Sequence, residues 1–258
     1  MESTSEMGYD KSLLVFNPRN HSYTYDGKRL LGVTTALSSI SRGDGLVQWA
    51  SNRACDYLRA NLPGPEDHPL LCTPEQYKED TDIIYSGAKY AWKAARDEAA
   101  SIGTTAHYWV ERYLKGEDPD WPTEPHAQRS AEAALQWIKS VKWETVAIEQ
   151  MLYIPDLAVA GTCDWFARVN GRLAIVDWKT SKSLHSTYAY QLAAYLKASE
   201  ELFEEKVSDR WLVRIDKETG IVEPRFLPEE TIEKDYRAFE SAVHIYRREQ
   251  EVKKEWQS

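Results

Sequence analysis

The stretch that decides the fold is residues 161–181, GTCDWFARVNGRLAIVDWKTS. At its centre Asn170-Gly171 separates two apolar segments that are rich in β-branched and aromatic residues. Such a dipeptide predicts a two-residue type I′ turn between antiparallel strands, because both turn residues then need a positive φ. The turn fixes the register, so Val169 faces Arg172 and the numbers of paired residues sum to 341.

This register predicts that Asp164 lies directly across from Asp177, with Lys179 two residues further along the same face. Opposed side chains in an antiparallel pair have Cβ atoms about 4.5–5.5 Å apart, so like charges there repel. Two opposed carboxylates therefore indicate a divalent cation between them, because hard cations prefer carboxylate oxygens. The alternative is that both acids lie at frayed strand ends, as they would if a β-bulge broke the register.

Both faces of this hairpin are apolar, which is typical of a central strand pair covered by helices on both sides. The predicted fold class is therefore α/β, with a central mixed β-sheet flanked by helices on both faces. The other expected strands are at Thr145–Pro155, Asp209–Asp216 and Ile221–Leu227, with a hairpin at His21–Thr35. Helices are expected at Gly45–Asn61, Ser86–Leu114, Ala127–Trp143, Thr187–Phe203 and Pro228–Trp256.

The domain organisation is predicted from the loops. Residues 1–20 read as a loose polar segment, and residues 62–80 contain four prolines, which is typical of a linker or an insertion. A break in the long helix is expected near Ser101–Gly103. We therefore expect an N-terminal hairpin and helical elaboration over residues 1–85. A core with a C-terminal helix is expected over 86–258, the two forming one compact unit.

Composition limits the class of protein. The chain has 258 residues, of which 41 are acidic and 32 basic, giving a net charge of −9. This balance argues against a protein that holds DNA through a broad cationic surface. No export signal or membrane span is visible, and three cysteines cannot build a disulfide framework, so we expect a soluble cytoplasmic protein.

Four sequence elements together resemble a known family. Asp164 followed by Asp177-x-Lys179 resembles the core of the PD-(D/E)XK nuclease superfamily, which has a restriction-endonuclease-like fold. Three elements resemble its RecB-like exonuclease branch: Gly103-Thr104-x-x-His107, Gly161-Thr162-x-Asp164 and Gln191-x-x-x-Tyr195. The segment Tyr23–Thr35 is similar to the leader of small phage and mitochondrial exonucleases of this type. Pro155-Asp156 is excluded as the motif, because it precedes the paired strands.

The resemblance implies a metal site and its ligands. Asp164, Asp177, the backbone carbonyl of Trp178 and His107 would bind Mg²⁺ or Mn²⁺, with His107 in the first turn of a helix that starts at Gly103. Lys179 would orient the attacking water or stabilise charge on the phosphate. An iron–sulphur cluster is not expected, because the four-cysteine set of some relatives is absent.

Other residues are expected in supporting roles. Gln191 and Tyr195 share one helical face and would contact the DNA backbone or position Lys179. Glu149 is a candidate carboxylate for a second metal ion or for the surroundings of the first. Ser181 and Lys182 lie in a polar loop that could hold phosphate oxygens.

The implied function is a divalent-metal-dependent DNA exonuclease that processes linear ends in recombination, replication or repair. Its partners would be single- or double-stranded DNA and a recombination or single-strand-binding protein, in a bacterial cell or a phage-infected host. Two alternatives remain open: a structure-specific or restriction-like endonuclease of the same fold, and a non-catalytic acidic interaction protein that retains the fold.

Overall fold

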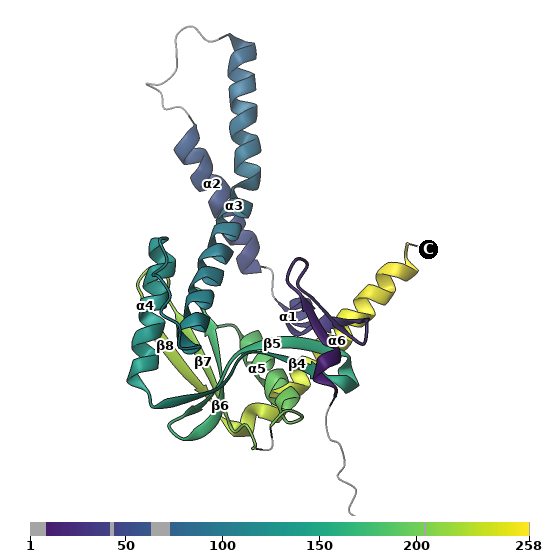
Figure 1. Cartoon of the computed structure of the whole chain (residues 1–258). Helices are drawn as coiled ribbons and strands as arrows, with labels where there is room; N and C mark the ends of the chain where they lie inside the picture. Colours follow the sequence, from purple (N-terminus) through teal and green to yellow (C-terminus); the bar gives the residue numbers. More distant parts are fainter. Residues whose placement is uncertain (1–8, 42–43, 63–72, 204, 258) are drawn as a thin grey trace, which may run out of the picture. The chain divides into compact units, whose positions relative to one another are not determined.

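The computed structural model describes residues 9–41, 44–62, 73–203 and 205–257 (Figure 1). The chain divides into two compact units. One comprises Met1–Ser41 together with Thr105–Ser258, and the other is Arg42–Thr104. Two compact units do not have to be two independently folding domains. The predicted domain boundary after residue 85 therefore stays a prediction.

The larger unit is built on a mixed sheet. Its strands are β1 (Leu14–Asn17), β2 (Ser22–Tyr25), β3 (Lys28–Gly32), β4 (Trp143–Ile154), β5 (Val159–Val169), β6 (Arg172–Lys179), β7 (Asp209–Ile215) and β8 (Val222–Leu227). The order is β1-β2-β3-β5-β6-β7-β8, with β4 also paired to β5. The pairs β3–β5 and β6–β7 are parallel and the others antiparallel. The parallel β6–β7 pair requires a crossover, which α5 (Ser186–Ser199) supplies.

The β5–β6 hairpin has the predicted register and turn. Trp165 pairs with Val176 and Val169 with Arg172. Asn170 has φ 53° and Gly171 φ 85°, as a type I′ turn requires. The turn at Asp26-Gly27 between β2 and β3 likewise has two positive φ angles.

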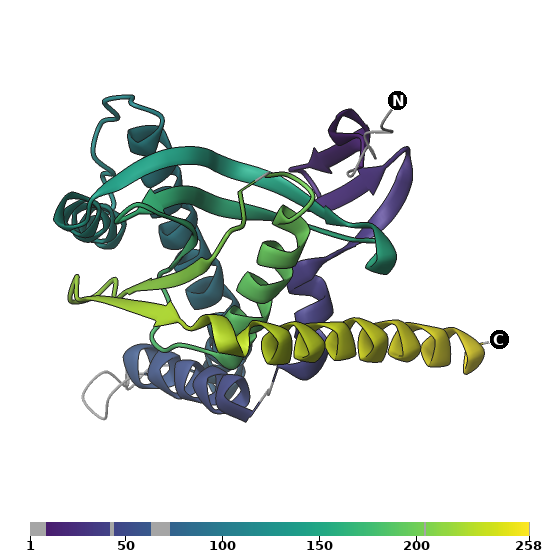
Figure 2. The same cartoon turned by 90° about the horizontal axis from the view of Figure 1, so that it is seen from below.

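Helices cover both faces of this sheet, so the predicted α/β fold class is confirmed. On one face α1 (Val33–Leu37), α5 and α6 (Ile232–Glu255) bury a core that includes Phe166, Ile175 and Phe239. Figure 2 shows α5 and α6 side by side. On the other face α4 (Pro125–Ser140) and residues 105–114 of α3 pack on a core that includes Trp165 and Val176.

The smaller unit is helical. It contains α2 (Asp44–Asn61) and the first thirty-one residues of α3 (Pro74–Leu114). The ring of Tyr57 on α2 packs directly on Gly87 of α3, where any Cβ atom would overlap it. Glycine at this position leaves room for the ring, at a cost of about 1 kcal/mol relative to alanine in a helix interior.

Several predicted boundaries differ from the structure. α3 starts at Pro74, which suits the first turn of a helix, so residues 74–80 are helical rather than part of a linker. The predicted break at Gly103 is wrong, because α3 continues through it to Leu114. β1 lies within the segment expected to be loose, and α4 ends at Ser140, before β4 starts at Trp143. The rest of the predicted linker, residues 63–72, and the first eight residues lie outside the described chain.

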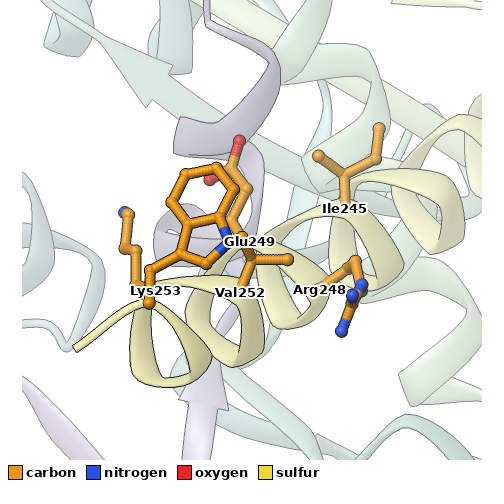
Figure 3. A pocket seen from close by; sticks show the side chains of 6 residues that line it. Ile245, Arg248, Glu249, Val252 and Lys253 are labelled. Carbon is orange, nitrogen blue, oxygen red and sulfur yellow. The ribbon is translucent and has the colours of Figure 1, made fainter. Parts of the chain in front are cut away.

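A large open hollow lies along the end of α6. Figure 3 shows the side chains of Ile245, Arg248, Glu249, Val252 and Lys253 around it. Its volume is about 520 Å³, and a single helix lines it. None of the candidate site residues contributes to it. In the part of the chain that the structure describes, no helix is long and apolar enough to cross a membrane.

Candidate functional site

The candidate site lies at a fork in the sheet. One edge of β5 pairs with β4 from Val159 to Val169, apart from Asp164, whereas the other edge pairs with β3 only at Val159 and Ala160 and with β6 only from Trp165 onward. Within the described residues, no strand pairs with residues 161–164 on this second edge. The end of β6, residues 177–179, is likewise paired only with β7. β5 and β6 therefore separate beyond the Trp165–Val176 pair, and Asp164 and Asp177 lie on opposite sides of the gap between them.

Asp164 bridges this fork. Its Oδ2 accepts a hydrogen bond of 2.9 Å from the backbone N–H of Trp178. The ladder between β5 and β6 ends one pair earlier, at Trp165–Val176, so Asp164 and Asp177 do not form the ladder pair that the register predicts. Cys163 and Phe166 both pack in the same core cluster, although residues three apart in a regular strand face opposite ways. β5 thus turns over at Asp164, which aims the carboxylate into the fork.

His107 of α3 approaches the same oxygen. Its Nδ1 lies 3.6 Å from Asp164 Oδ2, and the imidazole is also within hydrogen-bonding reach of the Trp178 carbonyl. Burial lowers the pKa of His107, and Lys179 lowers it further, although Asp164 acts in the opposite direction. A neutral imidazole at neutral pH has a lone pair available for a metal ion. The expected helix start at Gly103 is absent, so His107 lies near the end of a long helix rather than in a first turn.

Asp177 is the most buried charged group of the site. Its side chain is 1% exposed, and among the described residues neither carboxylate oxygen has a hydrogen-bond partner of good geometry. The Lys179 ammonium forms an ion pair at 2.6 Å from Oδ2, without the angles of a hydrogen bond. Burial raises the pKa of Asp177; Lys179 opposes that shift and Asp164 adds to it. A buried carboxylate with unsatisfied oxygens is costly unless a further cation approaches it.

Lys179 is held between this carboxylate and an aromatic ring. Burial lowers the pKa of Lys179, but the charges of Asp177 and Asp164 outweigh this and raise it above the ordinary lysine value. The ammonium also lies 5.1 Å from the centroid of the Tyr188 ring. The lysine is therefore a fixed cation at the fork.

Glu149 adds a third carboxylate in the same row across the sheet. The β4–β5 ladder pairs Ile148 with Trp165 and Gln150 with Cys163, but not the intervening Glu149 with Asp164. Glu149 has φ 49°, a left-handed conformation that is unusual for a non-glycine residue in a strand. Its side chain is exposed, yet partial burial of the carboxylate and repulsion by Asp164 raise its pKa to about 8.

Two residues that the sequence reasoning missed lie near Glu149. The charges of Glu111 and Lys115 act on the pKa of Glu149, in opposite directions. These two residues form an ion pair of 2.5 Å with each other. Both follow His107 on α3 at intervals of four residues, and this helical spacing was a signal present in the sequence.

The Gln191-x-x-x-Tyr195 element of α5 packs against β5 next to the fork. Gln191 Nε2 donates to the hydroxyl of Tyr195 at 2.9 Å, and both side chains are buried on α5. The Tyr195 ring packs on Gly161, where a Cβ would lie 2.6 Å from ring atom Cε1. Two of the elements that carry the family resemblance are therefore in direct contact.

The loop after β6 is fixed by a buried arginine that the sequence reasoning also missed. Arg214 Nη1 donates to the carbonyl oxygens of Ser181 and Lys182 at 3.0 Å each. Ser181 Oγ donates to the carbonyl of Ser183, and Lys182 pairs with Glu218 at 3.2 Å. The Lys182 side chain is thus engaged with an acid in this structure, and its predicted contact with phosphate stays a prediction.

A hollow of about 530 Å³ opens beside the row of carboxylates. Glu149 of β4 and Thr162 of β5 line one part of it. The rest is formed by Met151 and the N-terminal residues Leu14, Val15, Phe16 and Pro18. This hollow offers space for a ligand next to the fork.

The residues at the fork fit a divalent cation by their chemistry. They supply two carboxylates, a neutral imidazole and a backbone carbonyl, and the unsatisfied oxygens of Asp177 lack a positive partner beyond Lys179. The side chains are not drawn together, however. Among the described residues, no three His, Cys, Asp or Glu side chains converge closely enough to hold a metal ion.

A comparison with protein families agrees with this chemistry. Residues 136–257 match the model of the PD-(D/E)XK nuclease superfamily. Members of this superfamily use divalent metal ions, typically Mg²⁺ or Mn²⁺, so the match indicates metal-dependent nuclease chemistry. The matched region contains the fork residues of β5 and β6 but not His107. The mixed sheet with helices on both faces is consistent with the restriction-endonuclease-like fold of the superfamily.

Two further comparisons add little. No curated protein matches the sequence. Among solved structures, a chain described as "Crystal structure of SSO0001" matches with 15% identity and a TM-score of 0.30. The match covers 75% of this chain and 84% of that chain. A score this low supports no argument about fold or function.

Proposed function

We propose that the chain is a divalent-metal-dependent DNA exonuclease that acts on DNA ends at the fork between β5 and β6. The observation that carries this proposal is the meeting of His107, Asp164 and the Trp178 carbonyl beside the unsatisfied carboxylate of Asp177. The family match to residues 136–257 supports nuclease chemistry, and the RecB-like motifs around His107, Asp164 and Gln191 favour the exonuclease branch.

In this proposal Asp164, Asp177, His107 and the Trp178 carbonyl bind Mg²⁺ or Mn²⁺. When bound, the ion supplies Lewis-acid charge and lowers the pKa of a coordinated water. Asp164 is already oriented by the hydrogen bond from the Trp178 N–H to its Oδ2. Asp177 would hold the ion with its buried carboxylate and would keep Lys179 beside it through their ion pair.

Lys179 is assigned the role of a positioned cation. Its ammonium is held at the fork by Asp177 and Tyr188, so it is ordered before substrate arrives. A fixed cation aimed at a phosphate stabilises the charge that develops when the phosphodiester is attacked. The attacking water would transfer its proton to a nearby carboxylate; Glu149, with a pKa of about 8, is a suitable acceptor when ionised.

Gln191 and Tyr195 are assigned an indirect role. Both are buried and hydrogen-bonded to each other, and Tyr195 packs on Gly161. They would position β5, and through it Asp164, instead of contacting the DNA backbone. Ser181 and Lys182 remain candidates for phosphate contacts at the edge of the site. The biological setting we propose is end processing in recombination, replication or repair, with a recombination or single-strand-binding protein as partner.

The test uses three DNA substrates of one sequence. Purified full-length protein is incubated with a 5′-labelled linear duplex, its single strand and a covalently closed circle, in Mg²⁺, Mn²⁺ or EDTA. Metal-dependent loss of linear DNA alone, abolished by Asp177→Ala, is the expected result. Cleavage of the closed circle would instead identify an endonuclease, and the absence of any cleavage would contradict nuclease function.

A further inference from the structure

One segment of α3 in the smaller unit has a composition unlike the rest of this acidic chain. Residues 83–96, IIYSGAKYAWKAAR, contain three basic residues, three aromatic residues and no acid. Acidic residues flank it, with Asp82 before it and Asp97 after it. In a chain of net charge −9, this is a local positive region with interleaved aromatic rings.

Most of these side chains share one face of the helix. Tyr85, Lys89, Trp92, Lys93 and Arg96 recur at intervals of three and four residues, which gathers them within a sector of about 100° on an α-helix. We call these five residues the basic aromatic face. Tyr85 is 57% exposed, and the three basic side chains are exposed as well.

This face points away from the packing side of the helix hairpin. Gly87, which receives the Tyr57 ring of α2, lies about half a turn from the centre of the face. Ala88, which is buried, lies between the packing side and the face, next to Trp92 on the helix surface. Within residues 42–104, the basic aromatic face therefore leaves Tyr85 and its three basic side chains exposed and Trp92 half-buried.

The cations on this face are available to a partner. In the described part of the chain, Lys89 and Lys93 have no carboxylate within ion-pair distance, whereas Arg96 pairs with Asp97 at 2.7 Å. The Arg96 guanidinium lies 5.3 Å from the centroid of the Trp92 ring, and Lys89 Nζ lies 5.6 Å from that of Tyr90. Arg96 and Trp92 thus lie one helix turn apart on the face, whereas the exposed ring of Tyr90 lies beside it.

We propose that the basic aromatic face binds single-stranded DNA. Surfaces that bind single strands combine cations for the phosphates with exposed rings on which bases stack, and they need no sequence preference. An acidic peptide would use the cations but has no need of exposed rings. Paired bases in a duplex cannot stack on protein rings without opening. The inference rests on the proposed nuclease function, because it names the form of DNA held and where.

The experiment measures binding without cleavage. Fluorescence anisotropy of a labelled oligothymidylate of about 20 nucleotides is recorded with full-length protein in EDTA, over a range of salt concentrations. The variants are Lys89→Gln/Lys93→Gln and Tyr85→Ala, all at exposed positions. Matched controls are Lys253→Gln/Lys254→Gln, at exposed positions of α6, and Trp256→Ala, at the exposed residue that follows the helix. Circular dichroism checks that every variant is folded.

The expected result separates charge from stacking. Lys89→Gln/Lys93→Gln should weaken binding at least about tenfold and reduce the slope of log K against log salt by about 1.4, at about 0.7 per cation lost. Tyr85→Ala should weaken binding at least about fivefold and leave the slope unchanged. The two control variants should bind like the wild type.

The inference is overturned if the face variants bind like the wild type, or if the controls lose as much affinity. It is also overturned if polyglutamate displaces the oligonucleotide while Tyr85→Ala has no effect, which would indicate a general anion surface. The two proposals fail separately. Wild-type protein that cleaves DNA while the face variants bind normally would refute only this inference. Wild-type protein that binds through the face but never cleaves would refute only the nuclease function.

Discussion

The backbone N–H of Trp178 donates to Oδ2 of Asp164 at 2.9 Å, across the fork where β5 and β6 separate. The same oxygen lies 3.6 Å from His107 Nδ1. One hydrogen bond therefore ends the ladder and fixes the orientation of a carboxylate towards a helix. A strand end that was merely frayed would leave this carboxylate in solvent, yet its side chain is only 17% exposed.

Removing the charge of Asp164 should abolish metal binding and preserve the fold. Asn in this position keeps an oxygen that can accept from Trp178 N–H but lacks the negative charge that a hard cation requires. Mutation of a residue that only hydrogen-bonds to a metal ligand lowers metal affinity by about 10–100-fold. Asp164 is proposed as a ligand itself, so Asp164→Asn should lower the affinity for the metal ion by at least about 100-fold. Calorimetric titration with Mn²⁺ measures this. Glu144→Gln, an exposed change on β4, is the control, and equal affinity for Mn²⁺ in Asp164→Asn would refute the assignment.

Gly161→Ala should destabilise the protein through Tyr195. The added Cβ would lie 2.6 Å from Cε1 of a ring that is buried and hydrogen-bonded to Gln191, so the ring cannot move aside. Overpacking of this kind costs about 1–3 kcal/mol, measured by urea unfolding. In a Tyr195→Ala background the same change should cost clearly less, because only the 3.1 Å approach to Val33 Cγ2 remains. An equal cost in both backgrounds would show that the ring is not the cause.

Glu149 should make the metal-free protein less stable as the pH rises. Its pKa is about 8 in the folded chain, against an ordinary value of 4.5, so the folded state holds a proton that the unfolded state releases. This contribution is fully present below pH 4.5 and is lost as the pH rises towards 8. Glu149→Gln should therefore flatten the fall in stability across that window, measured by urea unfolding in EDTA. An unchanged pH profile would contradict the raised pKa.

The hairpin that decides the fold could be predicted because local chemistry determines it. Asn170-Gly171 requires positive φ at both residues, and this alone sets the β5–β6 register. The two apolar faces then predict helices on both sides. The motif residues Asp164, Asp177 and Lys179 could be found for the same reason, since their spacing follows from the turn.

The fork and its irregularities could not be predicted, because they depend on pairing between distant segments. Nothing near Asp164 indicates that β3 takes over from β6 as the partner of β5. The left-handed φ of Glu149 is imposed by the strands around it. Pro74 is expected to belong to a linker because prolines cluster around it, whereas it is the first residue of α3. Arg214 read as an ordinary strand residue, although it holds two carbonyls of the loop after β6.

The most direct test of the account is the cleavage rate of a labelled single-stranded oligonucleotide in Mg²⁺, compared between wild type, Lys179→Ala and Lys206→Ala. Lys179 is a half-buried cation paired with Asp177 at the fork, whereas Lys206 is an exposed lysine paired with Glu229. The account predicts that Lys179→Ala lowers the rate by about 10²–10³, as expected when a positioned group that stabilises developing charge is lost. Lys206→Ala should cleave like the wild type. Wild-type cleavage that persists at full rate in Lys179→Ala would contradict the account.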